Sequence, residues 1–128
     1  MASFTLTGFS TTSQSLTGNE IGILVDGSAS LVTTGTAIAL SGSSNQVIIN
    51  GTVLATGSSS RVVTGTSASA EVSIGPSGFV KALRNDAIGG TYSDYFQLQN
   101  SGIIQSGGST VDIRTGDGST AINFTNTG

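Results

Sequence analysis

Apolar residues recur at every second position in several short stretches of the chain. Val47, Ile49 and Val53 follow this spacing, and Phe96 and Leu98 follow it later in the chain. Because successive side chains of a β-strand point to opposite faces, the spacing predicts half-buried strands with these five residues inward. No stretch has the apolar pattern of a convincing amphipathic helix.

A short signature of an apolar residue, a small residue and a glycine recurs along the chain. Taken at Gly18, Gly42, Gly65 and Gly90, it repeats at intervals of 24, 23 and 25 residues, and Arg114-Thr115-Gly116 continues it after 26. An apolar pair follows each glycine at a similar distance. These pairs are Ile23 with Val25, Val47 with Ile49, Ala70 with Val72, Phe96 with Leu98, and Ile122 with Phe124.

The repeat predicts an all-β fold, a single parallel β-solenoid of about five coils with about 24 residues each. Each coil is expected to hold a strand, a glycine turn, a second strand, an Asx-Gly turn and a third strand. Residues 79–86 are expected to form a strand with an outward loop or one helical turn. A right-handed coil is expected, because the short hexapeptide period of left-handed forms is absent. Residues 1–15 are interpreted as a partial coil or cap, and residues 16–128 as repeats that are open at the C-terminal Gly128.

Composition supports an ordered β protein and excludes several function classes. Gly, Ser and Thr account for 58 of the 128 residues, yet Ile, Val, Leu and Phe still supply 33 of them, more than the roughly 20% below which a chain stays disordered. The absence of Cys and His excludes disulfides, Cys/His zinc sites and catalysis by Ser-His or Cys-His groups. Four basic against seven acidic residues argue against nucleic-acid binding. No apolar run is long enough to predict membrane insertion.

Several stretches resemble coils of large bacterial secreted β-solenoid proteins, both autotransporter-like passengers and the solenoid regions of RTX-type proteins. The residues that carry the resemblance are the turn Asn100–Ile104 and the pair of segments 37–42 and 47–51. The resemblance implies an extracellular or cell-surface scaffold, adhesin or fibre. The first ten residues lack the basic and apolar regions of a signal peptide. We therefore expect this location without an N-terminal signal peptide in this chain.

Two segments partly match the calcium-binding repeat Gly-Gly-x-Gly-x-Asp-x-apolar-x. One leads from Gly89-Gly90 to Asp94, and the other from Gly107-Gly108 to Asp112, but both lack the middle glycine. Asp94 and Asp112 are thus weak candidates for calcium ligands. The simpler interpretation is a pair of glycine turns with solvated aspartates, so no cofactor and no metal site are predicted.

The other candidate chemistry is equally sparse. Asp94, Asp112 and Asp117 are too scattered for the paired carboxylates of a glycoside hydrolase, so no catalytic residue and no enzyme activity are predicted. Tyr92, Tyr95 and Phe96 form the one aromatic cluster, which could stack on a carbohydrate. The favoured interpretation places Phe96 in the core and the two tyrosines beside a widened turn or a contact surface.

These observations predict a structural, non-enzymatic building block. Core residues exposed on the end coils, together with unpaired strand edges, would let it associate end to end. With only 9% charged residues, little opposes such contact. We expect a homo-oligomer or filament, or a segment of a longer fibre or adhesin. The alternative is a ligand-binding module for calcium or glycans.

Overall fold

The computed structural model describes residues 3–115 and 121–127, which form an all-β parallel solenoid without a helix. The predicted fold class is therefore confirmed. Its strands are β1 (Phe4–Leu6), β2 (Phe9–Ser10), β3 (Gln14–Leu16), β4 (Asn19–Leu24), β5 (Ser30–Thr33), β6 (Ile38–Ile49), β7 (Thr52–Ala55), β8 (Val63–Ile74), β9 (Phe79–Ala82), β10 (Ile88–Asn100), β11 (Ile103–Ser106), β12 (Val111–Thr115) and β13 (Ala121–Asn126).

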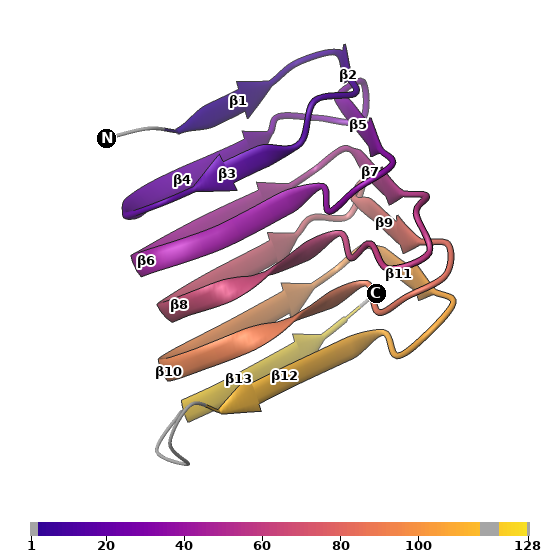
Figure 1. The fold of residues 1–128 in the computed structure, drawn as a ribbon. Helices are drawn as coiled ribbons and strands as arrows, with labels where there is room; N and C mark the ends of the chain where they lie inside the picture. The colour runs from indigo at the N-terminus through magenta and orange to yellow at the C-terminus, as the bar shows by residue number, and fades with distance from the viewer. Residues whose placement is uncertain (1–2, 116–120, 128) are drawn as a thin grey trace.

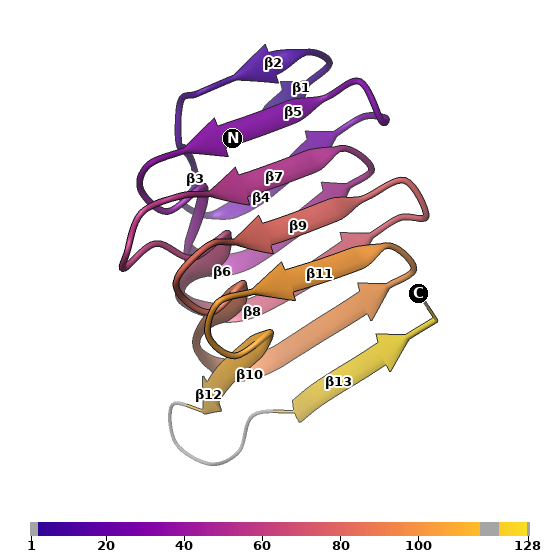
Figure 2. The same cartoon turned by 90° about the vertical axis from the view of Figure 1, so that its right-hand side faces the viewer.

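Each turn of the solenoid has three faces (Figure 1). The long strands β6, β8 and β10 fold back at one corner, so their leading halves build the first face and their trailing halves the second. β3 and β12 complete the first face, whereas β1, β4 and β13 complete the second. The five short strands β2, β5, β7, β9 and β11 form the third face, which Figure 2 shows from the front. Three strands per coil were predicted, but the first two form one bent strand.

The register gives four complete turns with a partial turn at each end, rather than the five predicted coils. Leu24 pairs with Ile49, Ile49 with Ile74, and the next steps lead to Asn100 and Asn126, so a turn measured along these pairs takes 25 or 26 residues. On the third face the spacing varies from 21 to 27 residues. The predicted glycine alignment slips because Gly65 pairs with Leu40 and not with Gly42. Inward-facing side chains, rather than glycines, keep the register. Seen from the N-terminal end, the chain winds clockwise as it recedes, so the coil is right-handed (Figures 1 and 2).

The core is built from columns of inward side chains that stack from turn to turn. One column, called here the Val47 column, contains Gly22, Val47, Val72, Leu98 and Phe124. All five residues predicted from the alternation to face inward are buried. Burial of an aliphatic or aromatic side chain of this size contributes about 1.5–3 kcal/mol. The stacked columns therefore supply the main stabilising free energy of the fold.

The first coil departs from the prediction by one residue. Ile23 and Val25 hold the places of Val47 and Ile49 in the repeat and would face inward by that analogy. Gly22 and Leu24 do so instead, and Val25 is 41% exposed. The reason lies in the turn above, where Phe4 pairs with Gly22 and covers it. A Cβ atom on Gly22 would come within 2.3 Å of Phe4 Cε1, so the missing side chain makes room for the ring.

Two local features lie between Gly75 and Asp86. Residues 79–86 form strand β9 followed by an outward loop and no helical turn, as one of the two predicted alternatives stated. Pro76 lies in a turn that a hydrogen bond from the Gly78 N–H to the Gly75 carbonyl closes, at 2.8 Å.

The predicted boundary after residue 15 lies within β3. Gly116, Asp117 and Gly128 lie outside the described residues.

Candidate functional site

The most unusual part of the molecule is its lower end in Figure 1, formed by β11, β12 and β13. β11 pairs only with β9, and β12 and β13 pair only with β10, among the described residues. Each of the three strands thus keeps one edge without a strand partner there. They contain four, five and six residues. We call these strands and their free edges the lower end.

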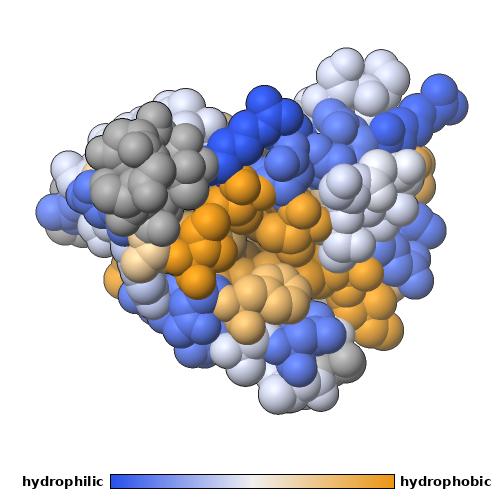
Figure 3. Space-filling view, turned by 90° about the horizontal axis from the view of Figure 1, so that it is seen from below, coloured by the Kyte–Doolittle hydropathy of each residue, from blue (hydrophilic) through white to orange (hydrophobic). Residues whose placement is uncertain are grey.

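Apolar side chains line the lower end. Ile122 and Phe124 are 50% and 52% exposed, although they continue the columns of Phe96 and Leu98, which are buried one turn above. Three further apolar residues, partly buried against the core, are Ile104, Val111 and Ile113. Figure 3 shows this apolar surface at the centre of the end, with polar residues around it.

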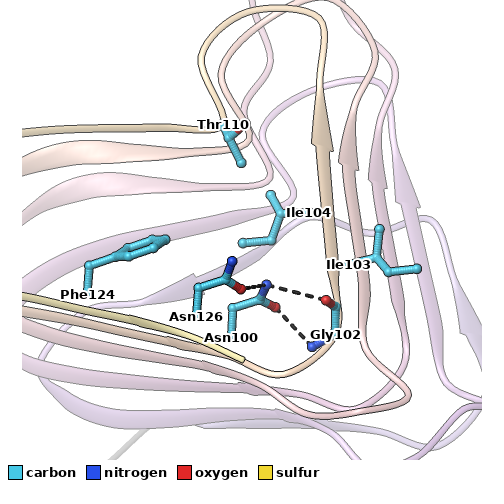
Figure 4. A pocket seen from close by; sticks show the side chains of 7 residues that line it. All are labelled: Asn100, Gly102, Ile103, Ile104, Thr110, Phe124 and Asn126. Carbon is cyan, nitrogen blue, oxygen red and sulfur yellow. Dashed lines mark hydrogen bonds between the residues drawn. The ribbon is translucent and has the colours of Figure 1, made fainter. Parts of the chain in front are cut away.

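A hollow of about 310 Å³ lies beside β11 on this end (Figure 4). Ile104 on β11 and Phe124 on β13 lie on opposite sides of it. One complete turn would place a further third-face strand here, below β11. The residues that line the hollow are Asn100, Gly102, Ile103, Ile104, Thr110, Phe124 and Asn126.

A pair of asparagines closes the corner next to the hollow. Asn100 Nδ2 donates to Asn126 Oδ1 at 2.8 Å and to the Gly102 carbonyl at 3.3 Å, while Asn100 Oδ1 accepts the Gly102 N–H at 3.1 Å (Figure 4). The two asparagines pair in register one turn apart and stack at this corner. They satisfy corner backbone groups that the strands leave without a partner.

The opposite, upper end of the solenoid is built differently. Its strands β1, β2 and β3 contain only three, two and three residues. The connection between β2 and β3 satisfies its own polar groups. Ser10 Oγ accepts the Thr12 N–H at 3.2 Å, and Gln14 Nε2 donates to the Thr12 carbonyl at 2.9 Å. Short edge strands are one way in which β proteins limit pairing with other chains.

The structure does not bring the two calcium candidates together. Asp112 pairs in register with Gly89, whereas Asp94 lies five residues further along β10, where the register to β8 shifts. Asp94 is exposed, and Asp112 contacts two arginines. Within residues 3–115 and 121–127, no three acidic side chains gather where they could hold a metal ion. Asp117, the third acid of the predicted set, lies outside these residues.

An ion-pair network on the first face was missed by the sequence reasoning. Arg61 Nη2 lies 2.9 Å from Asp86 Oδ2 and 3.5 Å from Asp112 Oδ2, and Arg114 Nη2 lies 3.3 Å from the same Asp112 oxygen. Asp86 also accepts the Ser109 N–H at 2.8 Å. The network therefore connects three successive turns. Its signal in the sequence is the spacing of Arg61, Asp86 and Asp112, which follows the 25- to 26-residue turn.

The aromatic cluster is mostly core. Tyr92 and Tyr95 flank the register shift in β10, as expected of a widened turn, but Tyr92 is fully buried. Its ring centroid lies 4.7 Å from that of Phe96, and its hydroxyl donates to the Gly89 carbonyl at 3.1 Å. Burial raises the pKa of the Tyr92 phenol far above its usual value. Only Tyr95, whose hydroxyl bonds Gln97 Oε1, remains at the surface for stacking on a ligand.

Two further observations complete the description. In the part of the chain that the structure describes, there is no helix of the length and apolar character needed to cross a membrane. Comparisons with protein-family models, curated proteins and solved structures gave no match.

Proposed function

We propose that this protein is a structural building block that associates with other copies through its lower end. The observation that supports the proposal is the combination of free strand edges on β11, β12 and β13 with the half-exposed side chains of Ile122 and Phe124. An unpaired edge beside an apolar surface is a template for pairing with another chain.

The lower end lacks several of the devices that usually prevent such pairing. Its strands are longer than those of the upper end, and they contain no proline. The inward positions Ile104, Val111, Ile113, Ile122 and Phe124 carry no charge. An inward-pointing charge on an edge strand would have opposed the approach of a second sheet edge.

The proposal is non-enzymatic and keeps the wider setting that the resemblance implies. A solenoid that binds its own kind would serve as a unit of an extracellular or cell-surface fibre or adhesin. Among the described residues, no three acidic side chains gather where they could hold a metal ion. Calcium or glycan binding gains no supporting contact from the positions of Asp94, Asp112 and Tyr95.

Sedimentation velocity across a hundredfold range of protein concentration tests the proposal. The wild-type chain is expected to shift from monomer to larger species as its concentration rises. Phe124→Asp should keep the chain monomeric over the same range, because association would bury an unpaired carboxylate. Leu83→Asp is the matched control, since Leu83 is 44% exposed in the loop after β9 and belongs to none of the strands β11, β12 and β13.

The outcomes separate clearly. Loss of association in Phe124→Asp with retention in Leu83→Asp supports a contact through the lower end. A wild-type chain that stays monomeric at every concentration contradicts the proposal. Equal loss in both variants assigns the association to general surface hydrophobicity and also contradicts it.

A further inference from the structure

We infer that copies join head to tail by strand exchange, in which β13 of one copy takes the place of β1 on β4 of the next copy. The inference rests on the proposed function and names the partner surface, which is the upper end of a second copy. Two different ends of the chain meet in such a junction. Interfaces of this kind extend into open filaments when successive copies do not close a ring.

The order of the end strands on the three faces supplies the first argument. At the lower end, the chain passes through the third face in β11, the first face in β12 and the second face in β13. The next turn would begin on the third face, and β2, β3 and β4 of a second copy follow this order. Each would pair in parallel with the strand above it, β2 with β11, β3 with β12 and β4 with β13. Their other edges already pair with β5 and β6 of their own copy.

In this junction, β1 of the second copy occupies the place that β13 needs, because it lies on the second face above β4. β1 pairs with β4 through three residues, whereas all six residues of β13 pair with β10. β4 itself has six residues and can accept β13 along its whole length. The shorter β1 is therefore the strand that leaves. Exchange of equivalent elements between copies is a low-cost route to association.

β13 also matches β1 in sequence and in register. β1 reads Phe-Thr-Leu, and the second half of β13 reads Phe-Thr-Asn. Phe4 pairs with Gly22 at the start of the Val47 column, and Phe124 is the last residue of the same column. Strand exchange would place the Phe124 ring over Gly22 of the second copy, in the space that the Phe4 ring fills within one copy. The half-exposed Phe124 would then be covered.

The backbone hydrogen bonds at this corner continue through the junction. Within one copy, the Val25 N–H donates to the Leu6 carbonyl at 3.1 Å, and at the same corner of the last turn the Thr127 N–H donates to the Asn100 carbonyl at 2.8 Å. After the exchange, the Asn126 carbonyl takes the place of the Leu6 carbonyl, so the Val25 N–H keeps an acceptor. The Asn126 side chain stays bonded to Asn100 of its own copy at 2.8 Å.

Exposed apolar residues meet on the third face as well. Phe9 on β2 is 71% exposed, and Ile103 on β11 is 53% exposed. They are the first and last residues of one column, which runs through Ser30, Thr52 and Phe79. The junction makes them neighbours on adjacent strands, where each removes apolar surface of the other from water. β2 of the second copy would also cover the hollow of about 310 Å³ beside β11 (Figure 4).

Charge also favours the upper end as the partner surface. Val111 on β12 continues the column that begins with Gln14 on β3. Three residues further along both strands, Arg114 would lie above Thr17 of the second copy, whose N–H donates to Glu20 Oε2 at 2.6 Å. Arg114 is well exposed, and its five N–H donors exceed what its ion pair at 3.3 Å within the described residues uses. The junction thus brings a base of one copy beside an acid of the other, where opposite charges attract.

A disulfide that holds β1 on β4 tests the exchange, because the chain has no natural cysteine. Thr5 pairs with Ile23, and neighbouring strands lie about 4.8 Å apart, within the range of about 4.4–6.8 Å between Cα atoms that a disulfide spans. The double variant Thr5→Cys, Ile23→Cys should stay monomeric when oxidised and associate when reduced, as measured by sedimentation velocity. The matched control is Ser30→Cys, Thr52→Cys, a pair in register between β5 and β7, which should associate in both states.

Cross-linking between copies tests which strands meet. Thr125 follows Phe124 as Ile23 follows Gly22, so strand exchange places Thr125 of one copy beside Ile23 of the next. A mixture of Thr125→Cys chains with Ile23→Cys chains should give a covalent dimer under mild oxidation. Each variant by itself is the control and should stay monomeric on a non-reducing gel.

Weakening β1 separates strand exchange from simple contact between exposed apolar surfaces. Phe4→Ala should strengthen self-association on the order of tenfold, because it loosens the hold of β1 on β4. A contact that left β1 in place would gain nothing from the loss of this ring. Sedimentation velocity over the concentration range used for the wild type measures the change.

The results distinguish the inference from the function on which it rests. If the wild-type chain never associates, the proposed function and the inference both fail. If it associates while the oxidised Thr5→Cys, Ile23→Cys variant, shown by thiol titration to hold its disulfide, associates equally well, the inference alone is overturned. A covalent dimer from Thr125→Cys by itself would join two lower ends and overturn it too. Weaker association of Phe4→Ala, with the chain shown folded by circular dichroism, has the same consequence.

Discussion

Two phenylalanines, Phe4 and Phe124, lie at opposite ends of the Val47 column and have opposite surroundings. Phe4 is half-buried because it lies over Gly22, a position without a side chain. Phe124 pairs with Leu98 on its upper side and is 52% exposed. One aromatic ring thus completes the core from above, whereas the other extends it below without a cover.

The comparison shows that an end of a solenoid is closed by its edges as much as by its side chains. At the upper end, three very short strands and a self-bonded connection limit the backbone available for pairing. At the lower end, the longer β12 and β13 leave backbone groups and apolar side chains accessible together. The two ends differ in the length of their terminal strands and in exposed apolar area, and this difference is the basis of the proposed association through the lower end.

The largest expected effect comes from placing the same charge at neighbouring positions of the column. Leu98→Asp should unfold the chain at room temperature, because an unpaired buried carboxylate costs several kcal/mol and a domain is stable by only about 5–15 kcal/mol. Phe124→Asp should lower the free energy of unfolding by only about 1 kcal/mol, since half of the ring is already in water. Urea denaturation of monomeric protein, followed by circular dichroism, measures both. Equal losses would mean that the lower end is as closed as the interior.

An intermediate effect is expected at the upper end. Phe4→Ala should lower the free energy of unfolding by about 2 kcal/mol, less than for a fully buried phenylalanine, because it uncovers the space above Gly22. Gly22→Val should also destabilise, since a Cβ there would clash with the Phe4 ring.

The double variant provides the control for this pair. With Phe4→Ala present, valine at position 22 restores a side chain to the column, so the double variant should be more stable than the sum of the single losses predicts. Additive losses, measured by the same urea titrations, would show that Phe4 does not complete the column.

The smallest effect concerns the closed interior. Tyr92→Phe removes one buried hydrogen bond and should cost about 1 kcal/mol at neutral pH. Because burial raises the pKa of Tyr92 in the folded state, only the unfolded chain ionises this phenol just above pH 10. The stability that Tyr92 contributes is thus complete below that pH and falls as the pH rises. Melting temperatures between pH 8 and 11 should decline less steeply for Tyr92→Phe than for the wild type, and parallel declines would contradict this assignment.

Particular residues show how far the sequence predicted these features. The alternation of Val47, Ile49 and Val53 predicted their burial, because a period of two is a local property of one strand. The inward positions inferred for the first coil were shifted by one residue. Ile23 and Leu24 are both apolar, so the alternation alone allows either to face inward. The ring of Phe4, from the turn above, fits over Gly22 and so selects Leu24. The hollow and the partners of Asp112 were not predicted, since they depend on contacts between turns.

By itself, the sequence determined that this protein is an all-β repeat of strands and glycine turns with an aliphatic core. That information is local, because strand period, turn residues and repeat length are all written along the chain. Only the tertiary structure decided the register between turns, the burial of Tyr92, the network around Arg61 and the contrast between the two ends. Each of these depends on which residues of successive turns lie side by side. That pairing follows from the packing of inward side chains between neighbouring turns.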